Sequence, residues 1–273
     1  MLQSVSAYWT QHHQAPRRFK RQSVYAHSVN FEHQGTLLTF HDRSRVPSPM
    51  SILLNLSETE LAPFFHDIET LVMTSRGIVL QDVCYPFDLT EQTSHQLHVH
   101  SPLSSSSLKC LQTQLDTVFA SNPPSNTLEA QWFEQRLNHL QHHASEAASL
   151  RDALSSLMGF GSGLTPAGDD ALVGFLAGLY YTQQDELLTD VKHHLTELLA
   201  QPNVTVWLSQ HFLHMALDGW FIEPILTLYD HLMKDQSIEA IIHQIHSLGH
   251  TSGTDLLRGL ALAISTGGNL YGS

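Results

Sequence analysis

Hydrophobic and polar positions follow two different patterns along this chain. Up to about residue 100, short β-prone runs cover residues 24–31, 36–40, 51–56 and 77–84, separated by polar or proline-bearing stretches. A glycine-bearing segment, residues 32–35, lies between the first two runs, which is the spacing typical of a β-hairpin. This part of the chain therefore predicts short antiparallel strands.

Two further features belong to this first part. Ser57 and Glu60 have the spacing of a capping box, which predicts a short helix between two strands. The basic run at residues 17–21 precedes the first predicted strand. We interpret it as a solvated lead-in rather than as an arm that binds nucleic acid.

Beyond two linker-like segments, residues 101–107 and 121–127, the pattern changes. Apolar residues then recur at spacings of three and four, which predicts amphipathic helices. The expected helices cover residues 128–157, 171–180, 187–199, 206–229, 238–248 and 256–264. Pro224 lies inside the fourth of these and is expected to kink or split it.

The two patterns together predict an α+β protein. A β-rich, barrel-like N-terminal domain is expected over residues 1–105. An all-helical C-terminal domain is expected over residues 106–273.

Composition narrows the class of function. The chain has 273 residues, 42% hydrophobic and 14% charged, with a formal net charge of −13. Such a charge does not attract nucleic acid or an anionic membrane, and no apolar run reaches the roughly 18 residues of a membrane span. Residues 1–15 lack the apolar core of a signal peptide, and Cys84 and Cys110 have no metal-binding or redox spacing. We therefore expect a cytoplasmic protein without nucleic-acid or membrane partners.

Histidine is abundant, with 20 copies in the chain. The candidate metal ligands among them are His95, His98 and His100; His139, His142 and His143; His211 and His214; and His243, His246 and His250. They occur along the whole chain, without a motif such as His-Glu-x-x-His. A metal site needs ligands at a defined spacing and a second shell, so we predict none built from histidines.

The most unusual segment is residues 159–170, Gly-Phe-Gly-Ser-Gly-Leu-Thr-Pro-Ala-Gly-Asp-Asp. Four glycines in ten residues allow positive φ and close approach to a ligand. Thr165 and Pro166 suit the N-cap and first position of a helix, where free N–H groups bind phosphate or carboxylate. Asp169 and Asp170 would repel an anion, unless they hold Mg²⁺, orient a substrate amide or act as a base. A helix cap does not explain four glycines and two acids, so we favour a functional site.

A second loop, Gly249-His-Thr-Ser-Gly-Thr-Asp255, again precedes an apolar helix. The pattern Gly168-x-Asp170-x-Leu172-x-Gly174 matches Gly253-x-Asp255-x-Leu257-x-Gly259 position for position. If the small-residue stripes of two parallel helices pack together, both acidic ends meet in one pocket; an antiparallel pair would separate them. A helix cap formed by Ser252 is the alternative for this loop.

These motifs resemble an uncharacterised family, domain of unknown function 2877, which includes AllH, the third subunit of the oxamate carbamoyltransferase of allantoin breakdown. The resemblance rests on residues 161–170 with Gly174 and on residues 249–255 with Gly259. Further support comes from Thr205, Ser209, Ala216, Gly219, Glu223, His27, Ser28 and Asn30. Many members of the family have no assigned activity, and some are labelled as carboxylases.

The resemblance implies transfer of a carbamoyl group between carbamoyl phosphate and oxamate, within a multi-subunit enzyme of purine catabolism. It implies ligand roles for Gly161, Gly163, Thr165, Asp169, Asp170, Ser252, Gly253 and Asp255. Apart from Arg258, neither loop region carries arginine or lysine, although sites for phosphate and carboxylate commonly use arginine. A partner subunit that supplies one would leave this chain inactive alone.

We therefore expect a carbamoyltransferase-type enzyme or enzyme subunit that acts on a small carboxylate or amide. Asp169, Asp170 and Asp255 are the predicted catalytic residues, which orient the substrate or a cation. The predicted ligand-binding residues are Gly161, Ser162, Gly163, Thr165, Gly168, His250, Thr251, Ser252, Gly253 and Glu223. Two alternatives stay open: a hydrolase or carboxylase that binds Mg²⁺ through Asp169 and Asp170, and a non-catalytic binding or assembly subunit.

Overall fold

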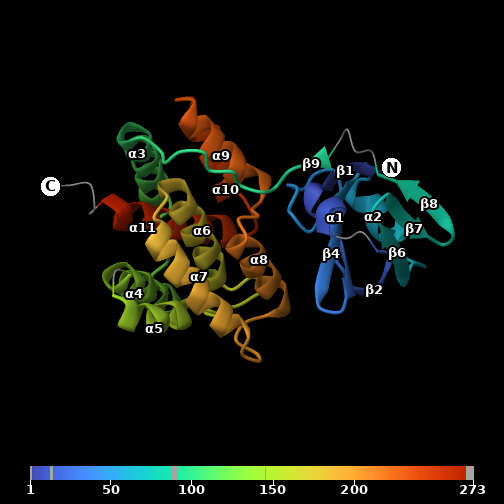
Figure 1. The fold of residues 1–273 in the computed structure, drawn as a ribbon, viewed down its shortest axis with the longest axis horizontal. Coiled ribbons are helices and arrows are strands. Elements are labelled where there is room, and N and C mark those ends of the chain that lie inside the picture. The colour runs from blue at the N-terminus through green and yellow to red at the C-terminus, as the bar shows by residue number, and fades with distance from the viewer. Residues whose placement is uncertain (1, 13–14, 88–91, 145, 269–273) are drawn as a thin grey trace. The chain divides into compact units, whose positions relative to one another are not determined.

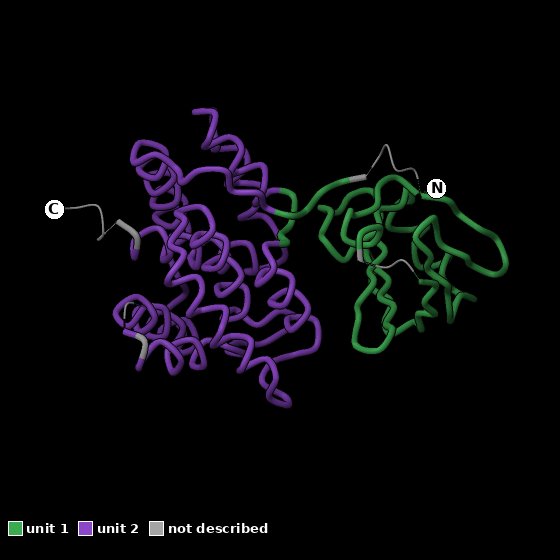
Figure 2. The backbone as a smooth tube through the Cα atoms, in the orientation of Figure 1, with its two compact units in different colours: residues 1–96, 220–223 green, residues 97–219, 224–273 purple. Residues whose placement is uncertain are grey.

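The computed structural model describes residues 2–12, 15–87, 92–144 and 146–268. The chain forms two compact units, drawn in different colours in Figure 2. The first unit comprises residues 1–96 and 220–223, and the second comprises residues 97–219 and 224–273. Strands lie in the first and helices α3–α11 follow, so the predicted α+β class is confirmed (Figure 1). The domain boundary expected between residues 105 and 106 stays a prediction.

The first unit is built on a sheet that has nine strands among the described residues, in the order β8-β7-β6-β2-β3-β4-β5-β1-β9. The strands are β1 (Leu2–Ser6), β2 (Arg17–Val24), β3 (Ser28–His33), β4 (Thr36–His41), β5 (Ser51–Leu54), β6 (Thr70–Thr74), β7 (Gly77–Leu80), β8 (Val83–Pro86) and β9 (Gln92–Thr93). The pairs β4–β5 and β1–β9 are parallel, and the other neighbours are antiparallel. Two short helices accompany the sheet, α1 (Ala7–His12) and α2 (Glu58–Phe64).

The sheet curls around an aromatic core, which gives the predicted barrel-like form. Phe19 on β2, Phe31 on β3 and Phe40 on β4 are fully buried, as is Phe65 after α2. The ring centroids of Phe31 and Phe40 lie 5.6 Å apart, and those of Phe40 and Phe65 lie 4.9 Å apart. Aromatic rings from several strands therefore hold the inner face of the sheet together.

Two local predictions for this unit are confirmed. Gln34 and Gly35, both at positive φ, form the turn between the antiparallel strands β3 and β4, as the glycine-bearing segment predicts. Helix α2 starts where the capping box predicts it. There the N–H group of Ser57 donates a hydrogen bond of 2.8 Å to the Glu60 carboxylate.

Two strand predictions and one loop prediction are wrong. The run 24–31 is not one strand, because the chain bends at residues 25–27 and separates β2 from β3. The basic run 17–21 is not a lead-in, because it lies within β2 itself. The run 77–84 holds two strands, β7 and β8, because Gln81–Asp82 adopts positive φ and forms a tight hairpin turn.

The second unit contains helices only among its described residues. They are α3 (Ser105–Ser121), α4 (Leu128–His143), α5 (Ala147–Leu157), α6 (Ala167–Thr182), α7 (Asp185–Leu199), α8 (Trp207–Leu217), α9 (Glu223–Met233), α10 (Glu239–His246) and α11 (Ser252–Gly268). Pro224 lies in the first turn of α9, so the predicted split is confirmed. The predicted linker 101–107 is wrong in its second half: Ser104 caps α3 by accepting a hydrogen bond of 3.1 Å from the Ser107 N–H group.

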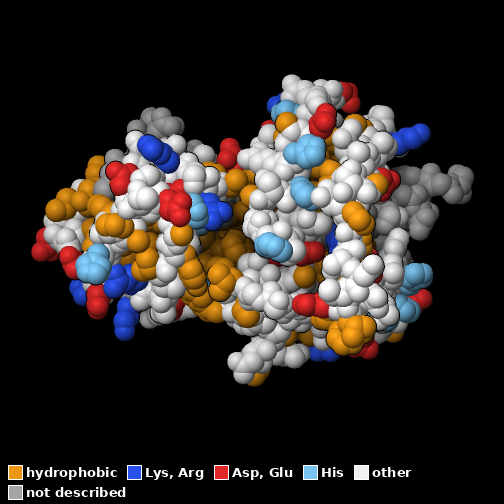
Figure 3. All heavy atoms as spheres, turned by 180° about the vertical axis from the view of Figure 1, so that it is seen from behind, with side chains coloured by type: hydrophobic (Ala, Val, Ile, Leu, Met, Phe, Trp, Pro, Cys, Tyr) orange, Lys and Arg blue, Asp and Glu red, His pale blue; other side chains and the backbone are white. Residues whose placement is uncertain are grey.

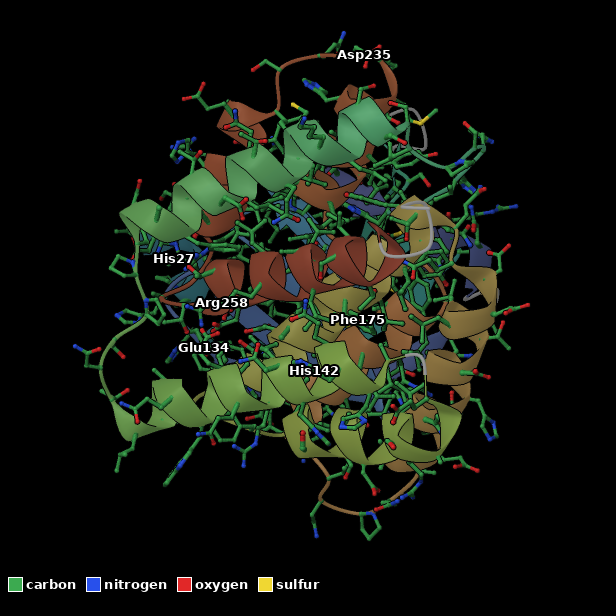
Figure 4. The ribbon with its side chains drawn as sticks, turned by 90° about the vertical axis from the view of Figure 1, so that its left-hand side faces the viewer. His27, Glu134, His142, Phe175, Asp235 and Arg258 are labelled. Atoms are coloured by element: carbon green, nitrogen blue, oxygen red, sulfur yellow. The ribbon has the colours of Figure 1, made fainter. Side chains whose placement is uncertain are left out.

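Helices α6 and α11 form the centre of this unit, and Figure 4 shows Phe175 of α6 beside α11. Almost every residue of α6 from Gly168 to Thr182 is buried, so this helix packs against other elements on all sides. The loops that precede α6 and α11 hold the predicted site.

No helix among the described residues is long and apolar enough to cross a membrane. Charged side chains are sparse on the face shown in Figure 3, where backbone and uncharged side chains cover most of the surface. This distribution agrees with a chain in which only 14% of the residues are charged.

Candidate functional site

The two glycine-rich loops meet at the starts of the two central helices of the second unit. Loop 1, residues 158–166, joins α5 to α6, and loop 2, residues 247–251, joins α10 to α11. The hydroxyl oxygens of Thr165 and Ser252 lie within hydrogen-bonding distance, at 2.9 Å. The loops therefore converge, as their matching sequence patterns predict.

Parallel packing of α6 and α11 brings the loops together. Beyond the contact between the loops, a Cβ added at Gly174 would lie 1.9 Å from the carbonyl oxygen of Leu256. One turn later, a Cβ at Gly178 would lie 2.5 Å from the Cβ of Ala263. Residues further along α6 therefore contact residues further along α11, so the two helices run parallel. Only glycine is small enough at these two positions of α6. Two positive helix ends consequently point to one place.

The repeated motif is also a packing motif. A Cβ at Gly168 would lie 1.8 Å from the carbonyl oxygen of Leu157, at the end of α5. A Cβ at Gly253 would lie 1.8 Å from the carbonyl oxygen of Ile245, near the end of α10. In both copies, the glycine thus lets a helix start touch the preceding helix. Ligand contact at Gly168 and Gly253 stays a prediction.

Loop 1 has backbone geometry that glycine alone adopts easily. Gly161 and Gly163 have φ values of 111° and 103°. The N–H group of Gly168 closes the loop by donating a hydrogen bond of 2.9 Å to the Phe160 carbonyl. The N–H groups of residues 161–164 make no hydrogen bond to any described residue, so they are open to a ligand.

The start of α6 lies one residue later than the sequence predicts. Pro166 occupies the cap position and the helix begins at Ala167. The predicted cap, Thr165, turns its hydroxyl towards Ser252 instead. Ser252 is in turn the first residue of α11 rather than its cap.

Asp169 anchors the loop. Its carboxylate accepts a hydrogen bond of 2.8 Å from the Gly159 N–H group and another from the Thr205 hydroxyl. Only 2% of the residue is exposed. Burial raises the pKa of Asp169, and the hydrogen bonds from Thr205 and Gly159 oppose the rise. Both carboxylate oxygens thus have partners in the protein.

Asp170 lies where the two loops meet, and its environment differs from that of Asp169. Burial raises the pKa of Asp170 to about 8, although hydrogen bonding with Ser252 and Thr165 lowers it. The charge of Asp255 raises this pKa further. The Oδ2 atom of Asp170 is buried and has no hydrogen-bond partner among the described residues. At neutral pH this carboxyl group is protonated and has unused hydrogen-bonding capacity.

Asp255 is the third carboxyl group of the site. It is 5% exposed, and burial raises its pKa to about 6, against the attraction of Arg258. The hydroxyl of Thr251 in loop 2 also lowers this pKa. Asp255 is therefore mostly ionised at pH 7, in contrast to Asp170.

The other predicted ligand-binding residues are exposed. Ser162 lies in loop 1, and His250 and Thr251 lie in loop 2. Glu223 is exposed at the start of α9 and falls in the first unit, whereas the loops fall in the second. The structure thus groups the loop residues and assigns Glu223 to a different unit.

Helix α4 adds residues that sequence reasoning missed. The Phe133 ring stacks on the Phe160 ring of loop 1, with centroids 6.1 Å apart and planes 11° apart. The Arg136 guanidinium lies 4.1 Å from the centre of the Phe160 ring. The Glu134 carboxylate forms an ion pair with Arg258, whose Nη1 atom lies 3.0 Å away. Helix α4 has an ordinary amphipathic sequence, so nothing in its own pattern points to the loops.

One group of potential metal ligands occurs among the described residues: His193, His194 and Glu197 on α7. Their ligand atoms lie within 4.8 Å of one another, and the outer two residues are exposed. This group was not among the histidines considered from the sequence. The aspartates of the loops do not form such a group within the described part of the chain.

Comparison with known proteins agrees with the loop motifs. The model of a family described as oxamate carbamoyltransferase subunit AllH matches residues 157–264. The matched stretch begins at the end of α5, includes both loops and ends within α11. No solved structure matches the chain. Residues 157–264 of the chain are therefore similar to the AllH family of oxamate carbamoyltransferase subunits.

Proposed function

We propose that the junction of the two loops binds a small anionic or amide substrate, and that the chain is a carbamoyltransferase-type subunit. Carbamoyl phosphate and an oxamate-like carboxylate or amide are the proposed substrates. The observation that carries this proposal is the buried Oδ2 atom of Asp170, which has no partner among the described residues. A buried polar atom without a partner is costly, and a ligand group at the junction would satisfy it.

The loop amides suit the phosphate half of carbamoyl phosphate. The N–H groups of residues 161–164 are not used by described residues, and they lie in the loop that leads into α6. The start of α11 lies next to them through the contact between Thr165 and Ser252. N–H groups and two positive helix ends together favour a negative group at this position.

The carboxyl groups suit the amide half of the substrates. With its pKa raised to about 8, Asp170 is mostly protonated at pH 7 and repels an anion much less than an ionised carboxylate would. With a pKa of about 6, Asp255 is ionised at pH 7 and accepts hydrogen bonds from an NH₂ group. Two neighbouring carboxyl groups with different pKa values can therefore serve an acid and a base role.

The proposed reaction uses these groups in turn. The amide nitrogen of the oxamate-like substrate attacks the carbamoyl carbon and forms a new C–N bond. The bond between that carbon and the phosphate oxygen breaks, and phosphate leaves into the loop amides. The nitrogen loses one proton, which the ionised Asp255 accepts. Oriented binding of both substrates supplies most of the rate in such a step.

A Mg²⁺-dependent hydrolase or carboxylase has less support. Both oxygens of Asp169 already accept hydrogen bonds, from Gly159 and Thr205. Asp170 is then the remaining carboxylate of the adjacent pair, and Mg²⁺ bound there would need substrate phosphate and water as its other ligands. If Mg²⁺ is a ligand, substrate binding is lost on chelation.

Partner subunits are part of the proposal, because the matched family is described as a subunit. We expect the isolated chain to bind substrate and the assembled complex to turn it over. Binding in the complex without any effect of loop variants on turnover would favour a non-catalytic assembly role.

The test is calorimetric titration of the chain with oxamate, carbamoyl phosphate and inorganic phosphate, with Mg²⁺ and with a chelator. Asp170→Asn is the variant, and Asp152→Asn is its control, because Asp152 is exposed on α5. We expect binding by the parent and the control and at least tenfold weaker binding by Asp170→Asn. Equal affinity in all three proteins would contradict the proposed site.

A further inference from the structure

Arg258 lies beside the candidate site and is mostly buried. Its Nη1 atom lies 3.0 Å from the Glu134 carboxylate and 4.0 Å from the Asp255 carboxylate. The Arg258 side chain is 14% exposed, whereas that of Glu134 is 41% exposed. Figure 4 shows both residues between α11 and α4. The guanidinium is thus held in a crowded position at the start of α11.

A chain of contacts connects Arg258 to both loops. The guanidinium carbon lies 5.6 Å from the centre of the Phe133 ring, and that ring stacks on Phe160 of loop 1. Through Asp255, Arg258 also adjoins the carboxyl group of Asp170, because the charge of Asp255 acts on the pKa of Asp170. Arg258 therefore belongs to the same group of residues as the loop junction.

The hydrogen-bonding capacity of Arg258 is only partly used. A guanidinium has five N–H donors, and its ion pairs to described residues both use Nη1. The other side of the guanidinium, formed by Nε and Nη2, makes no hydrogen bond or ion pair to any described residue. That side presents two parallel N–H groups, the geometry that binds a carboxylate in bidentate fashion.

We propose that Arg258 binds the carboxylate of the substrate through Nε and Nη2, and that Glu134 is a positioning residue that holds Nη1. This inference rests on the proposed function and names the residue that selects the substrate class. The neighbouring Asp255 then faces the rest of the substrate. A monocarboxylate with an adjacent NH₂ group, such as oxamate, fits this pair of charges. A dicarboxylate such as oxalate brings a second negative charge against Asp255.

The proposal removes the need for an arginine from a partner subunit. Apart from Arg258, neither loop region of the sequence carries arginine or lysine. The structure supplies this cation from α11, and α4 fixes its orientation. The isolated chain is therefore expected to bind oxamate without any partner.

The test compares the calorimetric affinities of variants for oxamate, oxalate and inorganic phosphate. Arg258→Gln and Arg258→Lys should each weaken oxamate binding about tenfold or more, because neither keeps the bidentate edge. The affinity for inorganic phosphate, which the loop amides bind, should change less than threefold in the same variants. Glu134→Ala should weaken oxamate binding, because it frees Nη1, and Glu134→Gln should restore the affinity, since its amide oxygen still accepts from Nη1. Arg151→Gln is the matched control, because Arg151 is a more exposed arginine whose ion pair with Glu197 lies on α5 and α7.

Each other outcome overturns the proposal in a distinguishable way. If both Arg258 variants bind oxamate as the parent does while Asp170→Asn fails, the site stands and the role of Arg258 is wrong. If the Arg258 variants bind neither oxamate nor phosphate and unfold at lower temperature, the role of Arg258 is to stabilise the fold and not to bind the substrate. If the parent binds neither oxamate nor phosphate, the proposed function fails and this inference fails with it. A parent that binds oxalate as tightly as oxamate contradicts the role assigned to Asp255.

Discussion

Thr165 and Ser252 stand 87 positions apart in the chain, yet their hydroxyl oxygens lie 2.9 Å apart. Each belongs to one copy of a helix–loop–helix motif, α5–α6 or α10–α11. The glycines of α6 and α11 permit the close parallel packing that places the two copies side by side. A single contact therefore marks the place where two positive helix ends and two acidic residues, Asp170 and Asp255, come together.

Asp170→Asn should remove ligand binding without loss of stability. Burial makes the ionised form of Asp170 unfavourable. Asparagine has the same shape and no charge, so the variant avoids the free-energy cost of burying an ionised carboxylate above neutral pH. We expect an unchanged or higher melting temperature together with loss of the thermal shift caused by oxamate or carbamoyl phosphate. A variant that melts several degrees lower and still responds to ligand would show that Asp170 is only a structural cap.

Stability should fall as pH rises from about 6.5 to 8. The pKa of Asp170 is about 8 in the folded protein, and its ordinary value is 3.8. The folded state therefore binds more protons than the unfolded state in this interval, and stability is lost as pH rises. Each unit of pKa difference corresponds to about 1.4 kcal/mol, so the free energy of unfolding should fall by about 2 kcal/mol.

Denaturant titrations at several pH values measure this dependence. Asp255, with a pKa of about 6, has completed most of its titration below this interval. The buried His41 and His95, whose pKa values burial lowers from 6.5 to about 4, titrate near pH 6.5 only in the unfolded state, so they partly oppose this trend. Their contribution is the same in Asp170→Asn, so the difference between the two proteins reports on Asp170. The same slope in the parent and in Asp170→Asn would contradict the assignment to Asp170.

Alanine substitutions should distinguish glycines needed for packing from glycines needed for ligand binding. Gly253→Ala should destabilise the protein by about 3 kcal/mol, because its Cβ would lie 1.8 Å from a carbonyl oxygen of α10. A Cβ at Gly163 would meet no atom of the described residues within 4 Å. Gly163→Ala should therefore cost only about 1 kcal/mol, for its φ of 103°, and should weaken ligand binding instead.

Ala167→Gly is the control for this comparison, since it changes the same region without adding a Cβ. Thermal melts and calorimetric titrations of the three variants decide the point. If Gly163→Ala binds as tightly as Ala167→Gly and the parent, the backbone of loop 1 does not line the site.

Thr205→Val should lower stability while leaving ligand affinity within about threefold. The Thr205 hydroxyl donates a hydrogen bond to the buried carboxylate of Asp169, and its removal should cost about 1–3 kcal/mol. Thr205→Ser keeps the hydroxyl and should restore stability. If a stable Thr205→Val variant loses much of its ligand affinity, Asp169 contributes to ligand binding and not only to anchoring the loop.

The parts of the structure that follow from short-range pattern could be predicted from the sequence. The hairpin at Gln34–Gly35 and the helix after Ser57 have local turn and capping signals, and both form as expected. The repeated spacing of glycine and aspartate led to the hypothesis of converging loops, which requires parallel helices; an antiparallel pair was the open alternative. The fold class followed from the change of hydrophobic period near residue 100.

Features that depend on long-range packing could not be predicted. The contribution of Phe133 and Glu134 arises because α4 lies against loop 1 and α11, and nothing within α4 marks this. The adjacent residues Asp169 and Asp170 looked equivalent in sequence. In the structure, Asp169 has two hydrogen-bond partners, whereas Asp170 has a buried oxygen without a partner among the described residues. Such differences depend on which segments, distant in the chain, surround each carboxyl group.

The most direct test of the central claim, that two loops form one ligand site, is a nuclear magnetic resonance titration of the ¹⁵N-labelled chain. Oxamate and inorganic phosphate are added separately, and the backbone amide shifts are mapped. We predict saturable shifts in both loops, at residues 161–165 and 250–255, with one shared affinity for each ligand. Shifts confined to one loop, or different affinities at the two loops, would contradict a single site.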